Sequence, residues 1–156
     1  GMNARRRFWL GAAAFPFALL CSRVQAQADL LQLDEAFRIS ARWVEPGVVE
    51  LHYLIAPGYH LYRDRFSFRT DQGSASVAVI ELPPALERFD PAMGQKMRYY
   101  ADHVTVRVRL AGGQRAVKLT TTAQGCAAEL GVCYPPLVRV FELPASGGRE
   151  SRRERR

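Results

Sequence analysis

The chain has 156 residues, which is the size of a single domain once a processing segment is removed. Its formal net charge of +7 resides at the two ends, because residues 27–146 carry 13 basic and 13 acidic side chains. A basic face for nucleic acid is therefore not indicated, and we expect no nucleic-acid partner.

The first 26 residues have the organisation of a secretory signal peptide. Gly1 before Met2 resembles an expression scar, and arginines at 5–7 precede an apolar run at 8–21 with small residues near position 26. The apolar run is shorter than the roughly 20 residues that a membrane span needs, and a proline interrupts it. We therefore expect residues 1–26 to be removed on export, Cys21 with them, leaving a mature chain without a membrane span.

The remainder of the chain has the pattern of a β protein. Apolar and polar residues alternate in short runs that turn residues separate, which places one face of each strand on a core. Seven such runs predict an antiparallel, immunoglobulin-like β-sandwich over residues 27–146. The expected strands are 37–43, 49–55, 59–68, 75–82, 104–110, 117–121 and 137–143. Residues 147–156, GGRESRRERR, are expected to form a disordered basic tail.

Two segments depart from this alternation and are the candidate sites, because irregular segments on a rigid sandwich often carry function. One is the mixed-charge stretch 85–97, which a proline and a glycine interrupt. The other is 124–136, QGCAAELGVCYPP, in which six residues separate Cys126 from Cys133.

The cysteine pair permits three interpretations. An exported protein meets an oxidising compartment, so the two cysteines are expected to pair. A bond across so short a loop constrains the unfolded chain little, which strengthens the case for a redox role, although the residues alone still favour a structural role slightly. A zinc site is disfavoured because the cysteine spacing and the scattered histidines give no ligand set, while Met93 and Met97 with His103 form a soft set for copper.

The motif Gly125-Cys126 through Cys133-Tyr134-Pro135-Pro136 resembles the N-terminal periplasmic domain of the thiol:disulfide interchange protein DsbD. A second motif on an early strand, Pro57-Gly58-Tyr59-His60-Leu61-Tyr62-Arg63, supports the resemblance, which extends over nearly the whole mature chain. It implies an immunoglobulin-like periplasmic domain that carries electrons through one cysteine pair, a thiol:disulfide oxidoreductase with neither cofactor nor metal.

The resemblance also implies roles for single residues. Cys133 would form the mixed disulfide with a partner, and Cys126 would resolve it. Site-lining positions would be Tyr59, His60, Tyr62, Asp90 and Tyr134. The segment Asp90-Pro91-Ala92-Met93-Gly94 would be a cap that shields the disulfide, with Met93 in place of the aromatic residue that the family's cap carries.

The resemblance further implies a thioredoxin-like electron donor, and a disulfide isomerase or another oxidised periplasmic protein as acceptor. The sequence ends at Arg156 without a thioredoxin-like part, so both would be separate chains unless the sequence is a fragment. The alternatives are a non-catalytic binding module with a structural disulfide, and a copper-handling domain.

Overall fold

The computed structural model describes residues 30–71, 75–112 and 115–145. Twelve strands, one short α-helix and one 3₁₀ turn make up this part of the chain. Their bounds are α1 (Leu33–Ala36), β1 (Phe37–Glu45), β2 (Val48–Ile55), β3 (Tyr59–Tyr62), η1 (Arg63–Arg65), β4 (Ser67–Thr70), β5 (Ser76–Glu81), β6 (Leu86–Asp90), β7 (Gln95–Tyr100), β8 (His103–Ala111), β9 (Val117–Ala123), β10 (Gly125–Ala127), β11 (Val132–Cys133) and β12 (Leu137–Leu143).

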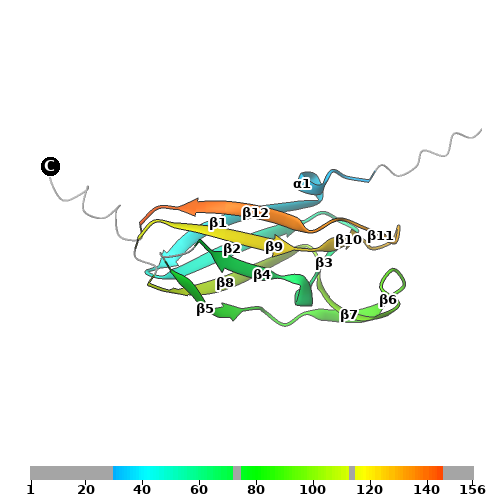
Figure 1. The fold of residues 1–156 in the computed structure, drawn as a ribbon. Helices are drawn as coiled ribbons and strands as arrows, with labels where there is room; N and C mark the ends of the chain where they lie inside the picture. Colours follow the sequence, from blue (N-terminus) through cyan, green and yellow to red (C-terminus); the bar gives the residue numbers. More distant parts are fainter. Residues whose placement is uncertain (1–29, 72–74, 113–114, 146–156) are drawn as a thin grey trace, which may run out of the picture.

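Two antiparallel sheets form the body of the molecule. One has the order β1-β2-β8-β5 and the other the order β12-β9-β4, and the two lie as layers against each other (Figure 1). Side chains alternate along β8, where the valines at 104, 106 and 108 are buried and the residues between them face outward. The inward residues of both sheets belong to one apolar cluster, which also includes Leu51, Leu119 and Leu137. The predicted all-β, immunoglobulin-like sandwich is confirmed.

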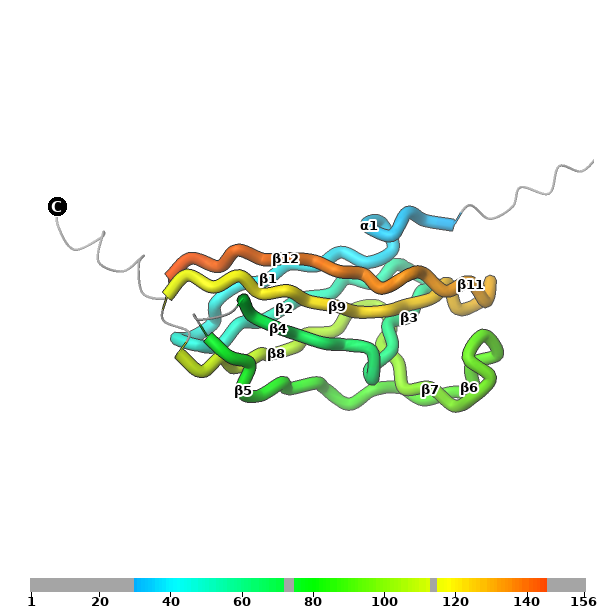
Figure 2. Tube along the Cα trace, viewed as in Figure 1, coloured from blue at the N-terminus to red at the C-terminus, as the bar shows by residue number. Residues whose placement is uncertain are grey.

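A third sheet, with the order β11-β10-β3-β7-β6, lies at one end of the sandwich. In Figure 2 the tip of the β6–β7 hairpin and the β10–β11 turn approach the same end of the molecule. Strand β3 pairs with β10 on one side and with β7 on the other. This sheet therefore brings the cysteine stretch, the Tyr59 motif and the segment around Asp90 together.

Three sequence-based expectations about local structure were wrong. The extended run expected over 59–68 is interrupted by η1, so β3 and β4 are separate strands in different sheets. Residues 85–97, expected to be irregular, form the β6–β7 hairpin. Residues 86–89 are all exposed, so β6 has no buried face and hence no alternation to detect. The cysteine stretch also forms a small hairpin, β10–β11.

The predicted signal peptide, its leading Gly1 and the predicted tail lie outside the described residues. Within the described ranges, no helix is both long and apolar enough to cross a membrane.

Candidate functional site

The frame of the candidate site is the ladder of β3, β10 and β11. Cys126 of β10 lies directly opposite Cys133 of β11 on one side and opposite His60 of β3 on the other. Side chains at directly opposite positions of an antiparallel pair point to the same face. The two cysteines form a disulfide, with Cα atoms 4.0 Å apart.

Gly125 permits the close approach of β10 to β3. A Cβ atom at this position would lie 2.3 Å from the carbonyl oxygen of His60 and 2.5 Å from the ring of Phe37. Both distances are far below van der Waals contact, so only glycine fits. Gly125 is therefore required for the close packing of β10 on β3, and this packing positions Cys126.

The two cysteines differ in their exposure. Cys126 is 1% exposed and belongs to a small buried cluster with Tyr62 and Met97. Cys133 is exposed and lies on β11, which is an edge strand of its sheet. An incoming thiolate must reach a sulfur atom in order to attack it. In this geometry Cys133 offers that sulfur and Cys126 does not.

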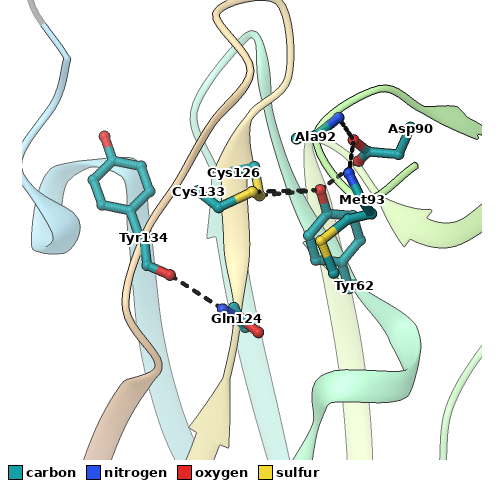
Figure 3. Close-up of a disulfide and its surroundings, with 8 residues drawn as sticks. All are labelled: Tyr62, Asp90, Ala92, Met93, Gln124, Cys126, Cys133 and Tyr134. Carbon is teal, nitrogen blue, oxygen red and sulfur yellow. Dashed lines mark hydrogen bonds between the residues drawn. A yellow bond between two sulfur atoms is a disulfide. The ribbon is translucent and has the colours of Figure 1, made fainter. Parts of the chain in front are cut away.

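A tyrosine–carboxylate pair lies against the disulfide (Figure 3). The hydroxyl oxygen of Tyr62 is 3.0 Å from Sγ of Cys126 and 4.0 Å from Sγ of Cys133, and the hydroxyl donates a hydrogen bond to Asp90. A hydroxyl has a single proton, and a carboxylate is a stronger acceptor than a disulfide sulfur. Once the disulfide is reduced, the lone pairs of the Tyr62 oxygen are positioned to accept a hydrogen bond from the Cys126 thiol.

The pKa values of Tyr62 and Asp90 are shifted in opposite directions. Burial, reinforced by the neighbouring Asp90 carboxylate, raises the pKa of Tyr62 well above its ordinary value. Burial by itself raises the pKa of Asp90, but hydrogen bonds from Tyr62 and from the N–H groups of Ala92 and Met93 outweigh it, so the pKa of Asp90 lies below its ordinary value. At neutral pH the site therefore holds a carboxylate and a neutral phenol beside the sulfur atoms.

The lowered pKa of Asp90 predicts an acid-sensitive contribution to stability. Its folded-state pKa is below its unfolded-state pKa, so the stabilisation is present above the unfolded value and is lost as the pH falls through the folded value. We expect the difference in unfolding free energy between the wild type and Asp90→Asn to shrink from pH 7 towards pH 3, as measured by urea unfolding of the oxidised protein. Tyr62→Phe, which lacks the main side-chain donor, should reproduce part of this change, whereas parallel pH profiles for all three proteins would contradict it.

The predicted cap is the turn of the β6–β7 hairpin, and Asp90 organises it. One carboxylate oxygen of Asp90 accepts hydrogen bonds from the backbone N–H groups of Ala92, at 2.9 Å, and Met93, at 3.3 Å. The turn closes at Gly94, which has a φ of 66° and whose N–H donates to the backbone oxygen of Asp90. Pro91 and Ala92 are exposed, while Met93 is half-buried and packs against the cluster of Tyr62, Met97 and Cys126.

His60 lies beside the disulfide on the same face of the sheet as Cys126. Its imidazole stacks on the ring of Tyr99, with centroids 4.0 Å apart and planes at 21°, and the guanidinium of Arg88 lies 5.7 Å from the centre of the Tyr99 ring. Burial, and then the positive charge of Arg88, lower the pKa of His60. The contribution of Tyr99 and Arg88 was not predicted, because a stack between β3, β7 and β6 has no signal in the sequence.

The structure does not bring Tyr59 and Tyr134 to the sulfur atoms. Both rings pack edge-on against Phe37. Their hydroxyls meet the backbone of Leu31, where Tyr59 accepts from its N–H and Tyr134 donates to its carbonyl oxygen. Figure 3 shows Tyr134 on the far side of the cysteine hairpin from Tyr62. Tyr134 thus anchors the chain that follows Cys133, and Gln124 supports it with a hydrogen bond to its carbonyl oxygen at 3.3 Å.

No group of three or more His, Cys, Asp or Glu side chains is positioned to hold a metal ion among the residues that the structure describes. His103, the histidine considered with Met93 and Met97 as a copper ligand, lies on β8 opposite Leu54, in a different sheet from the cysteines.

The fold and the site together define a β-sandwich domain with a disulfide at one end, half buried and half accessible. The family model for the N-terminal part of the thiol:disulfide interchange protein DsbD matches residues 27–145. The chain belongs to this family of DsbD N-terminal domains.

Among its relatives, DsbD of Ralstonia nicotianae is 34% identical over 139 residues, which cover 89% of this chain and 23% of that protein. DsbD 1 of Pseudomonas aeruginosa is 34% identical over 114 residues, which cover 72% of this chain and 19% of that protein. The chain thus spans about a fifth of the length of these curated relatives.

Solved structures agree with this assignment. The reduced DsbD N-terminal domain of Neisseria meningitidis matches with a TM-score of 0.67 and 28% identity, covering 76% of this chain and 92% of that domain. The same domain in a complex with the N-terminal domain of PilB matches with a TM-score of 0.60, covering 73% of this chain and 87% of that one.

Proposed function

We propose that this chain is a periplasmic electron carrier that relays reducing equivalents by thiol–disulfide exchange at Cys126 and Cys133. The observation that carries the proposal is the asymmetry of the pair, in which an exposed Cys133 is bonded to a buried Cys126 that contacts Tyr62. Membership of a family of thiol:disulfide interchange proteins supports it.

The geometry supports the following loading step. A thiolate of the donor attacks Sγ of Cys133, the Cys126–Cys133 bond breaks, and Cys126 leaves as a thiolate that takes up a proton. The second thiol of the donor then attacks the mixed disulfide and releases Cys133 as a thiolate, which is protonated in turn. The donor leaves as a disulfide, and this domain has gained two electrons and two protons.

In the unloading step, this domain passes its two electrons to another protein. The Cys133 thiolate attacks an oxidised disulfide of the acceptor, and Cys126 resolves the mixed disulfide. Tyr62, whose oxygen lies nearest the Cys126 sulfur, and Asp90 provide a short path for the proton that Cys126 must lose.

The donor in this proposal is a thioredoxin-like protein, and the acceptor is a disulfide isomerase or another oxidised periplasmic protein. Exposed apolar side chains support docking at this end: Leu130 and Val132 precede Cys133, and Phe89 precedes Asp90. The N-terminal domain of DsbD from Neisseria meningitidis forms a complex with another protein's domain, that of PilB, which supports a relay between chains.

The redox potential of the pair tests this proposal. Structural disulfides in exported proteins have potentials below about −300 mV and resist reduction by glutathione, whereas a carrier must be reducible. We expect the Cys126–Cys133 bond to be reduced within ordinary ratios of reduced to oxidised glutathione, as read by thiol alkylation and mass spectrometry. A pair that stays oxidised throughout the titration would favour the non-catalytic binding module.

A further inference from the structure

The candidate site gathers four sulfur atoms from two hairpins, β6–β7 and β10–β11. Cys126 of β10 and Met97 of β7 belong to one buried cluster with Tyr62, and Met93 of the cap packs against that cluster. Cys133 of β11 is bonded to Cys126. Met93 and Met97 are the only methionines of residues 27–146, and both lie at this site.

The exchange reaction does not require this sulfur set. Shielding a disulfide needs only an apolar side chain of suitable size, and leucine or phenylalanine would provide one. Thioethers differ from these residues by being weak, soft donors to metal ions. The cysteines become soft donors only after the disulfide is reduced, when each can form a thiolate.

We propose that the reduced domain binds one Cu(I) ion through the thiolates of Cys126 and Cys133, with the thioethers of Met93 and Met97 completing the site. Binding displaces the two thiol protons and transfers no electrons, so the ion stays Cu(I). Transfer of two electrons to the disulfide of an acceptor protein re-forms the Cys126–Cys133 bond, which removes both thiolates and releases the ion. The site thus binds metal in only one of the two redox states of the cysteine pair.

The surrounding groups select a soft ion over zinc. Zinc takes four ligands from thiolate, imidazole and carboxylate groups, and thioethers are not among them. The Asp90 carboxylate already accepts hydrogen bonds from Tyr62, Ala92 and Met93. The His60 imidazole is stacked on Tyr99. Two thiolates and two thioethers remain, which is the kind of donor set that favours Cu(I).

The cap gives the thioether of Met93 its position. The hydrogen bond from the Met93 N–H to Asp90, at 3.3 Å, holds the Met93 backbone beside the buried cluster. The Met93 side chain is half-buried, whereas its neighbours Ala92 and Gly94 are exposed. A partly accessible thioether above a cysteine pair leaves a route by which an ion enters.

The test uses Cu(I) itself, supplied anaerobically from a colorimetric Cu(I) chelator, against the purified chain in its reduced and its oxidised form. We expect the reduced protein to remove one equivalent of Cu(I) from the chelator and the oxidised protein to remove none. X-ray absorption of the complex should show only sulfur neighbours, more than two in number. Zn(II) at the same concentration should not displace the ion.

Methionine variants separate the proposed site from an ordinary dithiol. Met93→Leu keeps the apolar volume, and we expect it to weaken Cu(I) binding roughly 10-fold, within the range for loss of a supporting group at a metal site. Glu129→Ala, an exposed change in the cysteine loop that removes no sulfur, should leave the affinity unchanged. Because Met97 is buried, its role is followed in the wild type by the NMR shift of its methyl group on addition of Cu(I).

Two results would overturn the proposal. One is that the reduced wild type fails to compete with the chelator. The other is that Met93→Leu binds with wild-type affinity while the absorption spectrum shows two sulfur neighbours, which is simple dithiol binding. Cu(I) binding is distinct from electron transfer and requires only that the Cys126–Cys133 pair can be reduced. A failure to bind Cu(I) would therefore leave the glutathione titration and the proposal of thiol–disulfide exchange unaffected.

Discussion

Replacing the two cysteines one at a time should give opposite results in a trapping reaction. In the chain from residue 27 onward, which lacks Cys21, Cys126→Ser leaves the exposed Cys133 as the single thiol. We expect it to form a stable mixed disulfide with a thioredoxin that retains one active-site cysteine, joined to an aromatic thiol by a disulfide. In the same chain Cys133→Ser leaves only Cys126, which is 1% exposed behind Tyr62 and the cap, and it should react on the order of 100-fold more slowly because attack requires access. Release of the aromatic thiol measures both rates.

The matched control is the same pair of variants in guanidinium chloride. Unfolding exposes both thiols, so the two rates should converge, which assigns the difference to the fold rather than to the local sequence. If the native Cys133→Ser protein reacts as fast as Cys126→Ser, the partner-facing role of Cys133 is refuted. Faster reaction of Cys133→Ser would mean that the two roles are exchanged.

The second large effect is expected at Gly125, where no side chain fits. A Cβ atom would meet the backbone oxygen of His60 and the ring of Phe37, and neither can move without displacing β3 or the buried face of β1. We expect Gly125→Ala to lower the free energy of unfolding by about 3 kcal/mol, the upper range for overpacking. Urea unfolding of the oxidised protein, followed by tyrosine fluorescence, measures this change.

A surface change in the same hairpin provides the comparison for Gly125→Ala. Glu129 is exposed, so Glu129→Ala should alter the unfolding free energy by no more than about 0.5 kcal/mol. Because β10 carries Cys126, the shift in Gly125→Ala should also expose the disulfide, and dithiothreitol should reduce it faster than it reduces the wild type. Wild-type stability and reduction rate in Gly125→Ala would show that β10 is not packed as described.

The residues that the resemblance assigned to the site do not all lie near the sulfur atoms. Tyr62 contacts the Cys126 sulfur atom, Asp90 accepts a hydrogen bond from Tyr62, and His60 lies opposite Cys126. Tyr59 and Tyr134 belong to the same motifs, but their side chains face Phe37 and Leu31 instead. Neighbours in a strand point to opposite faces, so a motif that spans consecutive positions necessarily contains residues of both faces.

The sequence by itself determined the sandwich, because alternating polarity records which face of a strand is buried, and it identified the cysteine pair through its short spacing and flanking motif. Only the tertiary structure decided that β6 and β7 form a hairpin, since the exposed face of β6 has no polarity pattern. The difference in exposure between the two cysteines was also decided only by the tertiary structure. Burial of Cys126 and exposure of Cys133 depend on β3, the cap and the sheet edge, which meet through contacts that span up to 71 positions of the chain. A local sequence pattern has no information about such contacts, and the chemistry of this site depends on them.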